Sequence, residues 1–281
     1  MSKDDGPVLY EQHGTVGVIT LNRPQRMNAM DQAMLVEIGR VADEAEADDS
    51  VHAIVLTGAG NGFSSGFDLK AQAADTPVGV EQWRSPLRND FDAVMRFWHM
   101  SKPTIAAVHG PALAGACEMA MACDITVASE DATFGEPELK FGAGIVVMIL
   151  PWMVGPKLAK EIILTGEDAI TATRAYEMGI VNRITPSGQH LEEAIRIGRR
   201  IAGFDRTLVR ETKRAINRTF ELMGMGEALE AALDIDLLIE GEGMPTKQAF
   251  LAIVREQGLR AAIAWRDERM LAREQGPQSP N

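Results

Sequence analysis

The chain contains 281 residues, 46% of them hydrophobic and 24% charged, which is the composition of a soluble globular protein with one large domain and an appendage. It carries 40 acidic against 28 basic residues, and the net charge of −12 argues against nucleic acid or an acidic membrane surface as a general partner. The longest apolar stretch, residues 145–154, contains Pro151 and is too short to span a bilayer.

The cysteines and the N-terminus bear on the cellular setting. Cys117 and Cys123 lie on one predicted helix and point to different faces, so we expect buried thiols rather than a disulfide or a metal pair. The histidines show no metal-binding spacing, and the sequence predicts no metal site. Residues 1–6 are charged and contain no apolar run, so we expect no secretory signal and a reducing, cytoplasmic setting.

Strands and helices alternate through the first 130 residues. Alternating apolar residues predict a strand over residues 15–21, and Asp31 is predicted to cap a helix that continues to about residue 47. Further predictions are a strand over residues 53–56, a helix over 83–100, and strands over 105–108 and 125–127. This order predicts an α/β fold whose parallel strands are covered by helices.

Strand patterns stop near Thr185, and the remaining chain has helical periodicity. Helices are predicted over residues 190–202, 207–222, 226–239 and 259–272. The change of pattern places a boundary near residue 200. Residues 1–199 are predicted to form the core that carries the active site, and residues 200–281 a C-terminal helical region.

The segment Gly62-Phe-Ser-Ser-Gly66 matches the G-x-S-x-G pattern of a nucleophile elbow. An elbow requires a strand that leads directly into the serine, whereas here the preceding strand ends near Leu56 and a glycine-rich turn intervenes. We therefore interpret this segment as a turn whose backbone amides face a ligand. A purely structural turn is the alternative.

A second turn of small residues, Gly110-Pro-Ala-Leu-Ala-Gly-Ala-Cys-Glu118, leads from an apolar strand into a helix that begins near Gly115. Such a turn directs free backbone N–H groups and the positive end of the helix dipole at one point, where a developing oxyanion is stabilised. Glu118 lies among Ala, Met and Cys, so its carboxylate is expected to be buried for a functional reason, with an ion pair as the structural alternative.

A second carboxylate, Glu138, follows in a predicted turn after a strand. Glu118 and Glu138 can serve as a base and acid pair, and the sequence therefore predicts carbonyl activation combined with proton transfer. Glu136 is expected either to face solvent or to contact the catalytic residues without touching the substrate.

Taken in order, these segments resemble the crotonase superfamily, also called the enoyl-CoA hydratase/isomerase family. The likeness extends from about Val8 to about Glu268, and each motif is modest while their joint order is highly specific. The motifs are Asn22-Arg-Pro24 with Asn28-Ala29, Phe63-x-x-Gly66-x-Asp68-Leu69, Lys102-Pro103, Ala114-Gly115-Ala-Cys-Glu118, Cys123-Asp124, Phe134-Gly-x-Pro-Glu138, Leu164-Thr-Gly166, Ala175-x-x-x-Gly179-Ile-Val-Asn182 and residues 262–266.

This resemblance implies a spiral of ββα units with a C-terminal helical region that supports trimers, often paired into hexamers. It implies an acyl thioester of coenzyme A as substrate and no separate cofactor. The oxyanion-hole amides of the family fall on Phe67 and Gly115, and the two hydratase carboxylates on Glu118 and Glu138. Substrate and coenzyme A contacts fall on Arg26, Met27, Ser65, Asp68, Leu69 and Lys70.

Both glutamates are retained, and the resemblance therefore favours reversible hydration of a 2-enoyl-CoA thioester through an enolate. An isomerase, or a hydrolase or lyase of the same superfamily, is the second reading. A catalytically silent protein that binds coenzyme A esters is the third.

The chain departs from the family pattern after the second glutamate. Hydratases of the family usually carry a Pro-Gly-x-Gly-Gly segment there, whereas here Gly142-Ala-Gly144 leads directly into the bulky residues 145–150. The span to Gly155 is about three residues shorter by the same comparison. We expect this segment to border the acyl pocket and either to close it to long straight chains or to reshape it for a bulkier acyl group.

Overall fold

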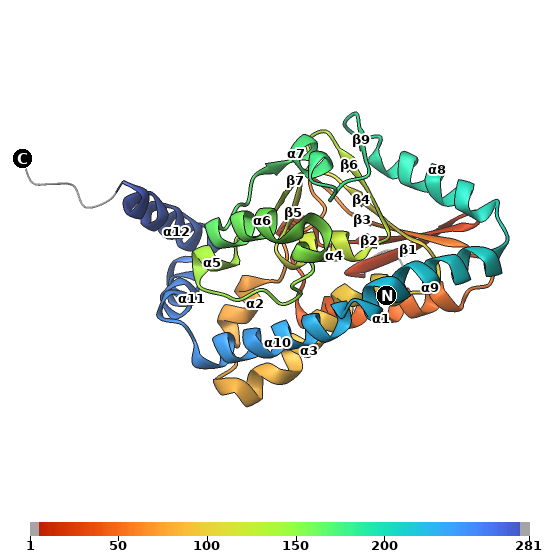
Figure 1. Ribbon diagram of the computed structural model, residues 1–281. Helices are drawn as coiled ribbons and strands as arrows, with labels where there is room; N and C mark the ends of the chain where they lie inside the picture. Colours follow the sequence, from red (N-terminus) through yellow and green to blue (C-terminus); the bar gives the residue numbers. More distant parts are fainter. Residues whose placement is uncertain (1–5, 276–281) are drawn as a thin grey trace, which may run out of the picture.

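The computed structural model describes residues 6–275, and Figure 1 shows a twisted sheet enclosed by helices. Most of the N-terminal segment that was examined for a secretory signal, residues 1–5, lies outside the described part of the chain. Between residues 6 and 275, no helix is long and apolar enough to cross a bilayer.

The main sheet has six strands in the order β1-β2-β3-β4-β6-β9. All neighbours are parallel except the N-terminal hairpin of β1 and β2, in which Val8 pairs with Leu21. The strands are β1 (Val8–His13), β2 (Val16–Leu21), β3 (Ala53–Gly58), β4 (Thr104–Val108), β6 (Ile125–Ser129) and β9 (Arg183–Thr185). The predicted α/β class is confirmed.

Helices cover both faces of this sheet, because successive side chains along each strand point to opposite faces. On β3, Val55 packs toward one face, where α8 (His190–Ala202) lies, while Ile54 and Leu56 belong to the larger core on the other face. That larger core is closed by α1 (Gln32–Ala47), α3 (Gly79–His99) and α4 (Gly115–Ala122). Asp31 caps α1 as predicted, since its carboxylate accepts a hydrogen bond from the Met34 amide at 3.0 Å.

A second, smaller sheet lies beside α4 in the order β5-β7-β8. Its strands are β5 (Pro111–Leu113), β7 (Thr133–Gly135) and β8 (Ile170–Thr171). The turns that follow β5 and β7 carry the residues predicted to act in catalysis. The connecting elements are η1 (Pro24–Arg26), α2 (Leu69–Ala74), α5 (Glu138–Phe141), α6 (Leu150–Thr165) and α7 (Ala172–Glu177).

The C-terminal helices run back across the molecule. They are α9 (Arg206–Leu222), α10 (Met225–Glu242), α11 (Pro245–Gln257) and α12 (Leu259–Glu274). α10 packs along α3, α11 packs against α2, and α12 packs against α11 and α5. In Figure 1, α11 and α12 therefore lie at the end of the molecule opposite α8.

The predicted helices agree closely with those observed: α4 begins at Gly115 as predicted, and α8 matches residue for residue. Helices α2, α5, α6, α7 and α11 were not predicted, and α11 begins with Pro245 as its first helical residue. The boundary near residue 200 stays a prediction. Helices from beyond it nevertheless pack against α2, α3 and α5 of the preceding part.

Candidate active site

Two backbone turns meet at the centre of the candidate site. Ser64 and Ala112 form a parallel β-bridge, in which the Ser64 amide donates to the Pro111 carbonyl at 3.0 Å and the Leu113 amide donates to the Ser64 carbonyl at 3.1 Å. These bonds hold the turn before α2 beside the turn before α4. As a result, the Phe67 ring lies directly against the Cα of Gly115, where an added Cβ would collide with it.

The backbone amides of Phe67 and Gly115 donate no hydrogen bond to any other residue between 6 and 275. Gly115 is the first residue of α4, so its amide lies at the positive end of the helix dipole. The preceding residue, Ala114, has φ 57° and ψ −136°, a conformation that non-glycine residues rarely adopt. The Gly115 amide is therefore a free donor at the positive end of the α4 dipole, which is what an oxyanion hole requires.

Asn28 ties these turns to the N-terminal part of the chain, a role that the sequence analysis missed. Its fully buried side-chain amide donates to the carbonyls of Ala59, Gly62 and Phe63 at 2.8, 2.9 and 3.1 Å. The Ser64 hydroxyl donates to the Asn28 carbonyl at 2.8 Å and accepts from the Gly66 amide at 3.1 Å. Ser64 is thus a structural part of the turn, in agreement with the rejection of a serine nucleophile.

Three glutamates converge beside the two turns. Glu118 projects from the first turn of α4, Glu136 follows β7, and Glu138 is the first residue of α5 rather than part of a simple turn. All three are buried, and each offers an oxygen that lies within 4.8 Å of the others. The solvent-facing option for Glu136 is therefore wrong: the short path from β7 to α5 leaves its side chain no route to the surface. Such a set could also ligate a cation, and the expected absence of a metal stays a prediction.

Burial and mutual repulsion raise the pKa values of these carboxyls. Desolvation and then the charge of Glu138 raise the pKa of Glu118 well above its ordinary value, while the Val147 amide, which donates to Glu118 at 3.2 Å, opposes the shift. Burial likewise raises the pKa of Glu138 to about 8 and that of Glu136 well above the ordinary range. Because three neighbouring buried carboxyls resist joint ionisation, the site holds protons as well as a basic oxygen at neutral pH.

A cavity of about 370 Å³ opens beside these groups. Of the residues predicted to act in the site, Phe67 and Glu138 line it together with all six predicted substrate contacts. Those six contacts are Arg26, Met27, Ser65, Asp68, Leu69 and Lys70. Gly115 and Glu118 lie just behind the cavity wall, next to the lining residues Ala114 and Glu138.

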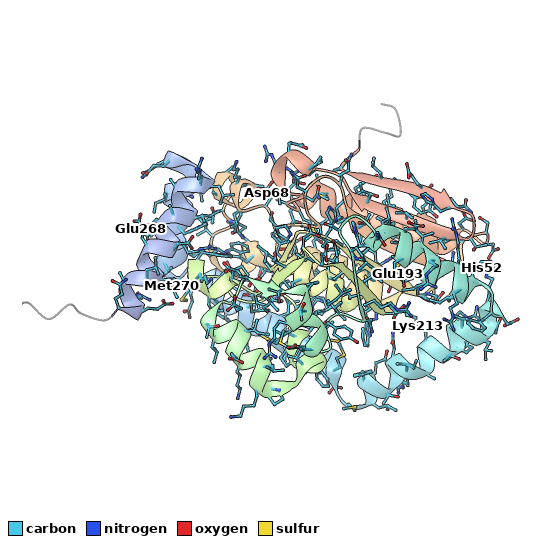
Figure 2. The ribbon with its side chains drawn as sticks, turned by 90° about the horizontal axis from the view of Figure 1, so that it is seen from above. His52, Asp68, Glu193, Lys213, Glu268 and Met270 are labelled. Carbon is cyan, nitrogen blue, oxygen red and sulfur yellow. The ribbon has the colours of Figure 1, made fainter. Side chains whose placement is uncertain are left out.

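The predicted substrate contact Asp68 is also a structural residue. Its carboxylate caps α2 by accepting from the amides of Lys70 and Ala71 at 3.0 and 3.1 Å. The same carboxylate pairs with Arg23 at 3.1 Å and with the half-exposed Arg26 at 3.3 Å. In Figure 2, Asp68 lies toward the α12 end of the molecule, which carries Glu268 and Met270, while His52 lies at the far end. Asp68 thus fixes one arginine at the cavity and leaves Lys70 exposed.

The segment that departs from the family pattern closes the other side of the site. Gly144 and Val146 line the cavity, whereas Ile145, Val147 and Ile149 are buried in the main core. The Val147 amide that binds Glu118 belongs to this segment. The expectation that the segment borders the pocket is confirmed, and its effect on the choice of acyl group stays a prediction.

A set of buried ionisable residues in the cavity wall was not predicted from the sequence. Asp90 from α3, Glu240 from α10 and Lys247 from α11 all line it and are all buried. In the sequence they stand far apart: Asp90 lies in a helix predicted from apolar periodicity, Glu240 lies just beyond the helix predicted over residues 226–239, and Lys247 lies in α11, which was not predicted. A charged residue at an otherwise apolar helix position was the one signal available.

Comparisons with known proteins agree with this geometry. The sequence model of the family described as enoyl-CoA hydratase/isomerase matches residues 11–238. A putative enoyl-CoA hydratase of Thermus thermophilus is 40% identical over 226 residues, covering 78% of this chain and 86% of that protein. A short-chain-enoyl-CoA hydratase of Clostridium acetobutylicum is 34% identical over 259 residues, covering 89% and 95%.

A solved structure is similar over almost the whole chain. The crystal structure of an enoyl-CoA hydratase/isomerase from Xanthobacter autotrophicus Py2 gives a TM-score of 0.93 at 63% identity, covering 94% of this chain and 98% of that one. The fold expected from the resemblance is therefore confirmed.

Proposed function

Because this chain belongs to the enoyl-CoA hydratase/isomerase family, we propose that it adds water reversibly across the 2,3 double bond of an acyl-CoA thioester. It is an enzyme of the hydratase type, a lyase. The observation that carries the proposal is the placement of two unengaged amides, those of Phe67 and Gly115, beside the buried pair Glu118 and Glu138.

In the proposed reaction, the thioester carbonyl oxygen accepts hydrogen bonds from the amides of Phe67 and Gly115. Negative charge that develops on this oxygen as the enolate forms is stabilised by both donors and by the α4 dipole. One catalytic carboxylate takes a proton from water while the hydroxide adds at Cβ. A proton is delivered to Cα as the enolate collapses, so that H and OH are added and nothing else is consumed.

The spacing of the glutamates suits a shared water. Their closest oxygens lie within 4.8 Å, and two hydrogen bonds of about 2.8 Å each can bridge that gap through a single water oxygen. The raised pKa values of Glu118 and Glu138 keep a proton available near neutrality, so the pair can act as acid and base together.

The glutamates provide the test of hydration. Glu118→Gln and Glu138→Gln should each lower kcat by roughly 10²–10⁴ with little change in ligand affinity, as expected when a positioned proton-transfer group is lost. Glu136→Gln is the matched control: burial raises the pKa of this carboxyl well above its ordinary value, so a neutral side chain of the same shape should keep kcat within a few-fold.

Hydration is followed by the loss of the enoyl-thioester absorbance and, in heavy water, by deuterium at Cα in the 3-hydroxyacyl product. Full hydration by Glu138→Gln would exclude the paired-carboxylate mechanism. Movement of the double bond without addition of oxygen would identify an isomerase. Binding of coenzyme A esters without any turnover would identify the silent binding protein.

A homo-oligomer, trimeric or hexameric, is a further part of the proposal. Its support is an apolar surface on and beside α9, where Phe204, Leu208, Ile216, Leu222 and Met223 are all more than half exposed. Surfaces of this kind commonly serve as contacts between subunits. The cytoplasmic setting also stays a proposal, supported by the free thiols of Cys117 and Cys123.

A further inference from the structure

Part of the cavity wall is built from charged residues rather than from apolar ones alone. Asp90, Glu240 and Lys247 line it and are between 4% and 8% exposed. The Lys247 ammonium pairs with Glu240 and lies 4.8 Å from the centre of the Trp83 ring. Burying charged side chains in a pocket that held only a hydrocarbon chain would cost free energy. We therefore expect the ligand to carry a polar group that bonds to these residues.

Asp236 lies behind the cavity wall, against the lining residue Gly144, and is buried without a hydrogen-bond partner in the described part of the chain. It is 2% exposed, and neither carboxyl oxygen makes a hydrogen bond within residues 6–275. One of these oxygens lies directly against the Cα of Gly144, a residue that lines the cavity, so a side chain at position 144 would collide with it. An unsatisfied buried carboxyl beside a ligand cavity is a hydrogen-bonding group without its partner.

The remaining members also have unused capacity. One oxygen of Asp90 accepts from the Gln32 side chain at 2.6 Å, and the other has no hydrogen-bond partner among residues 6–275. Lys247 has three N–H donors and one carboxylate partner, Glu240. This part of the cavity wall therefore offers both acceptors and a donor.

The position of this cluster relative to the catalytic glutamates follows from one short segment. The Gly144 amide donates to Glu240 at 3.3 Å, and the Val147 amide donates to Glu118 at 3.2 Å. Three residues separate these amides, so they are at most about 11 Å apart. The cluster is therefore within reach of an acyl chain whose reacting carbons lie at the glutamates.

From this arrangement we infer that the enzyme acts on enoyl-CoA thioesters whose acyl chain carries a hydroxyl group at its far end, held by the cavity-lining residues Asp90 and Lys247. A hydroxyl both donates and accepts, so it complements carboxylates and an ammonium at once. A terminal ammonium would meet Lys247, and a terminal carboxylate would meet the carboxyl groups of Asp90 and Glu240. The inference rests on the proposed function, because it places the thioester end at the two amides.

Matched pairs of substrates test the inference. Values of kcat/KM are measured for six- and eight-carbon 2-enoyl-CoA thioesters that end in methyl, hydroxyl, carboxylate or ammonium. For the wild-type enzyme we expect the hydroxylated compound to exceed the methyl compound about tenfold or more at one of these lengths, the effect of a hydrogen bond to a charged group. An equal or better methyl compound, or a better charged one, overturns the inference.

The variant Asp90→Leu removes the polar group at nearly constant shape. Its partner Gln32 is exposed and can turn to water, so the fold should be retained. We expect the preference for the hydroxyl compound to vanish in this variant and to persist in Asp92→Leu, an exposed position on the same helix. Persistence in Asp90→Leu would contradict the inference.

A binding measurement separates this inference from the proposed reaction. Dissociation constants of the saturated hexanoyl-CoA and 6-hydroxyhexanoyl-CoA are measured by calorimetry, which requires no turnover. Tighter binding of the hydroxyl compound, abolished in Asp90→Leu, supports the inference even if no enoyl-CoA is hydrated. Equal binding overturns it even if hydration is fast.

Discussion

At the scale of single residues, the site depends on backbone geometry that few side chains could tolerate. Gly115 is required because the Phe67 ring occupies the space of a Cβ, and Ala114 carries the strained dihedral angles that turn the next amide toward the cavity. Phe67 contributes its amide to the proposed oxyanion hole and its ring to the packing of that turn. The two roles of Phe67 can be separated by mutation.

We expect Phe67→Ala to retain most of the turnover, because its amide remains. Gly115→Ala should lower kcat at least about tenfold by displacing the ring and the amide, and the double variant Phe67→Ala/Gly115→Ala should recover most of this loss, since the colliding ring is gone. Gly115→Pro removes the donor itself, so it should cost about 10² or more and should not be rescued by Phe67→Ala.

Steady-state kinetics on the folded variants, checked by circular dichroism, decide between these roles. A severe loss in Phe67→Ala alone would show that the site uses the ring itself. Additive losses in the double variant would show that the ring and Gly115 are not coupled through contact.

At the scale of secondary-structure elements, the N-terminus of α2 links stability to the coenzyme A side of the site. Asp68 caps this helix and holds Arg23 and Arg26 with the same carboxylate. One buried acidic residue therefore fixes a helix start and a cavity-lining cation. A substitution at Asp68 therefore affects both the start of α2 and the position of Arg26.

The variant Asp68→Ala should lower the free energy of unfolding by about 1–3 kcal/mol, through loss of the cap and exposure of a broken, buried ion pair. It should also raise KM for acyl-CoA substrates, because Arg26 is released. The matched control is Asp205→Ala, which removes the exposed cap of α9, where Asp205 accepts from the Leu208 amide at 2.9 Å.

This control should lose about 1 kcal/mol without any change in KM. Urea unfolding and steady-state kinetics provide the two measurements. An unchanged KM in Asp68→Ala would mean that Arg26 does not contribute to substrate binding.

At the scale of the whole molecule, the interior contains several buried acidic side chains. Burial raises the pKa of Asp90 to about 7 and that of Asp236 to about 7, in addition to the raised pKa of Glu138 at about 8. These groups bind protons in the folded state that they release in the unfolded state at the same pH. Stability is therefore linked to pH through the same residues that surround the cavity.

We expect the free energy of unfolding to fall as the pH rises from about 6.5 to about 8.5. These carboxyls, whose pKa values are raised in the folded state, stabilise the fold fully at a pH below their unfolded pKa values. This stabilisation is lost as the pH rises through their folded pKa values. Burial lowers the pKa of His190 to about 4, and this group acts in the opposite direction only below its unfolded pKa of about 6.5.

Urea midpoints across this pH range provide the measurement for the wild type and for Asp236→Asn. The variant should show a shallower decline, because one titrating group is removed. A midpoint that stays flat or rises above pH 6.5 would contradict the expected burial of these carboxyls in the neutral form.

The assembly of the protein is the second prediction at this scale. Light scattering after size exclusion should give three or six times the chain mass of 30.5 kDa. The double variant Leu208→Asp/Ile216→Asp should dissociate toward the monomer, since charges in an apolar contact are not solvated. Val36→Asp, at an exposed position on α1, serves as the control and should leave the mass unchanged. A monomeric wild type would remove the α9 surface as an interface.

The α/β class, the start of α4, the limits of α8, the two glycine turns and the pair Glu118 and Glu138 could be predicted from the sequence alone. Each of these depends on local physics: periodicity marks a buried face, small residues permit tight turns, and a carboxylate among apolar neighbours needs a function. The order of the motifs along the chain then indicated the family, which the comparisons show.

The tertiary structure decided what no local pattern encodes. Glu136 is buried because β7 and α5 leave it no path to solvent, although its sequence neighbours resemble those of a surface residue. Asp90, Asp236, Glu240 and Lys247 meet only because α10 packs along α3 and α11 returns over the cavity. Contacts between distant helices follow from how whole faces pack, and this depends on all the elements at once, so the chemistry of this part of the cavity wall could not be read along the chain.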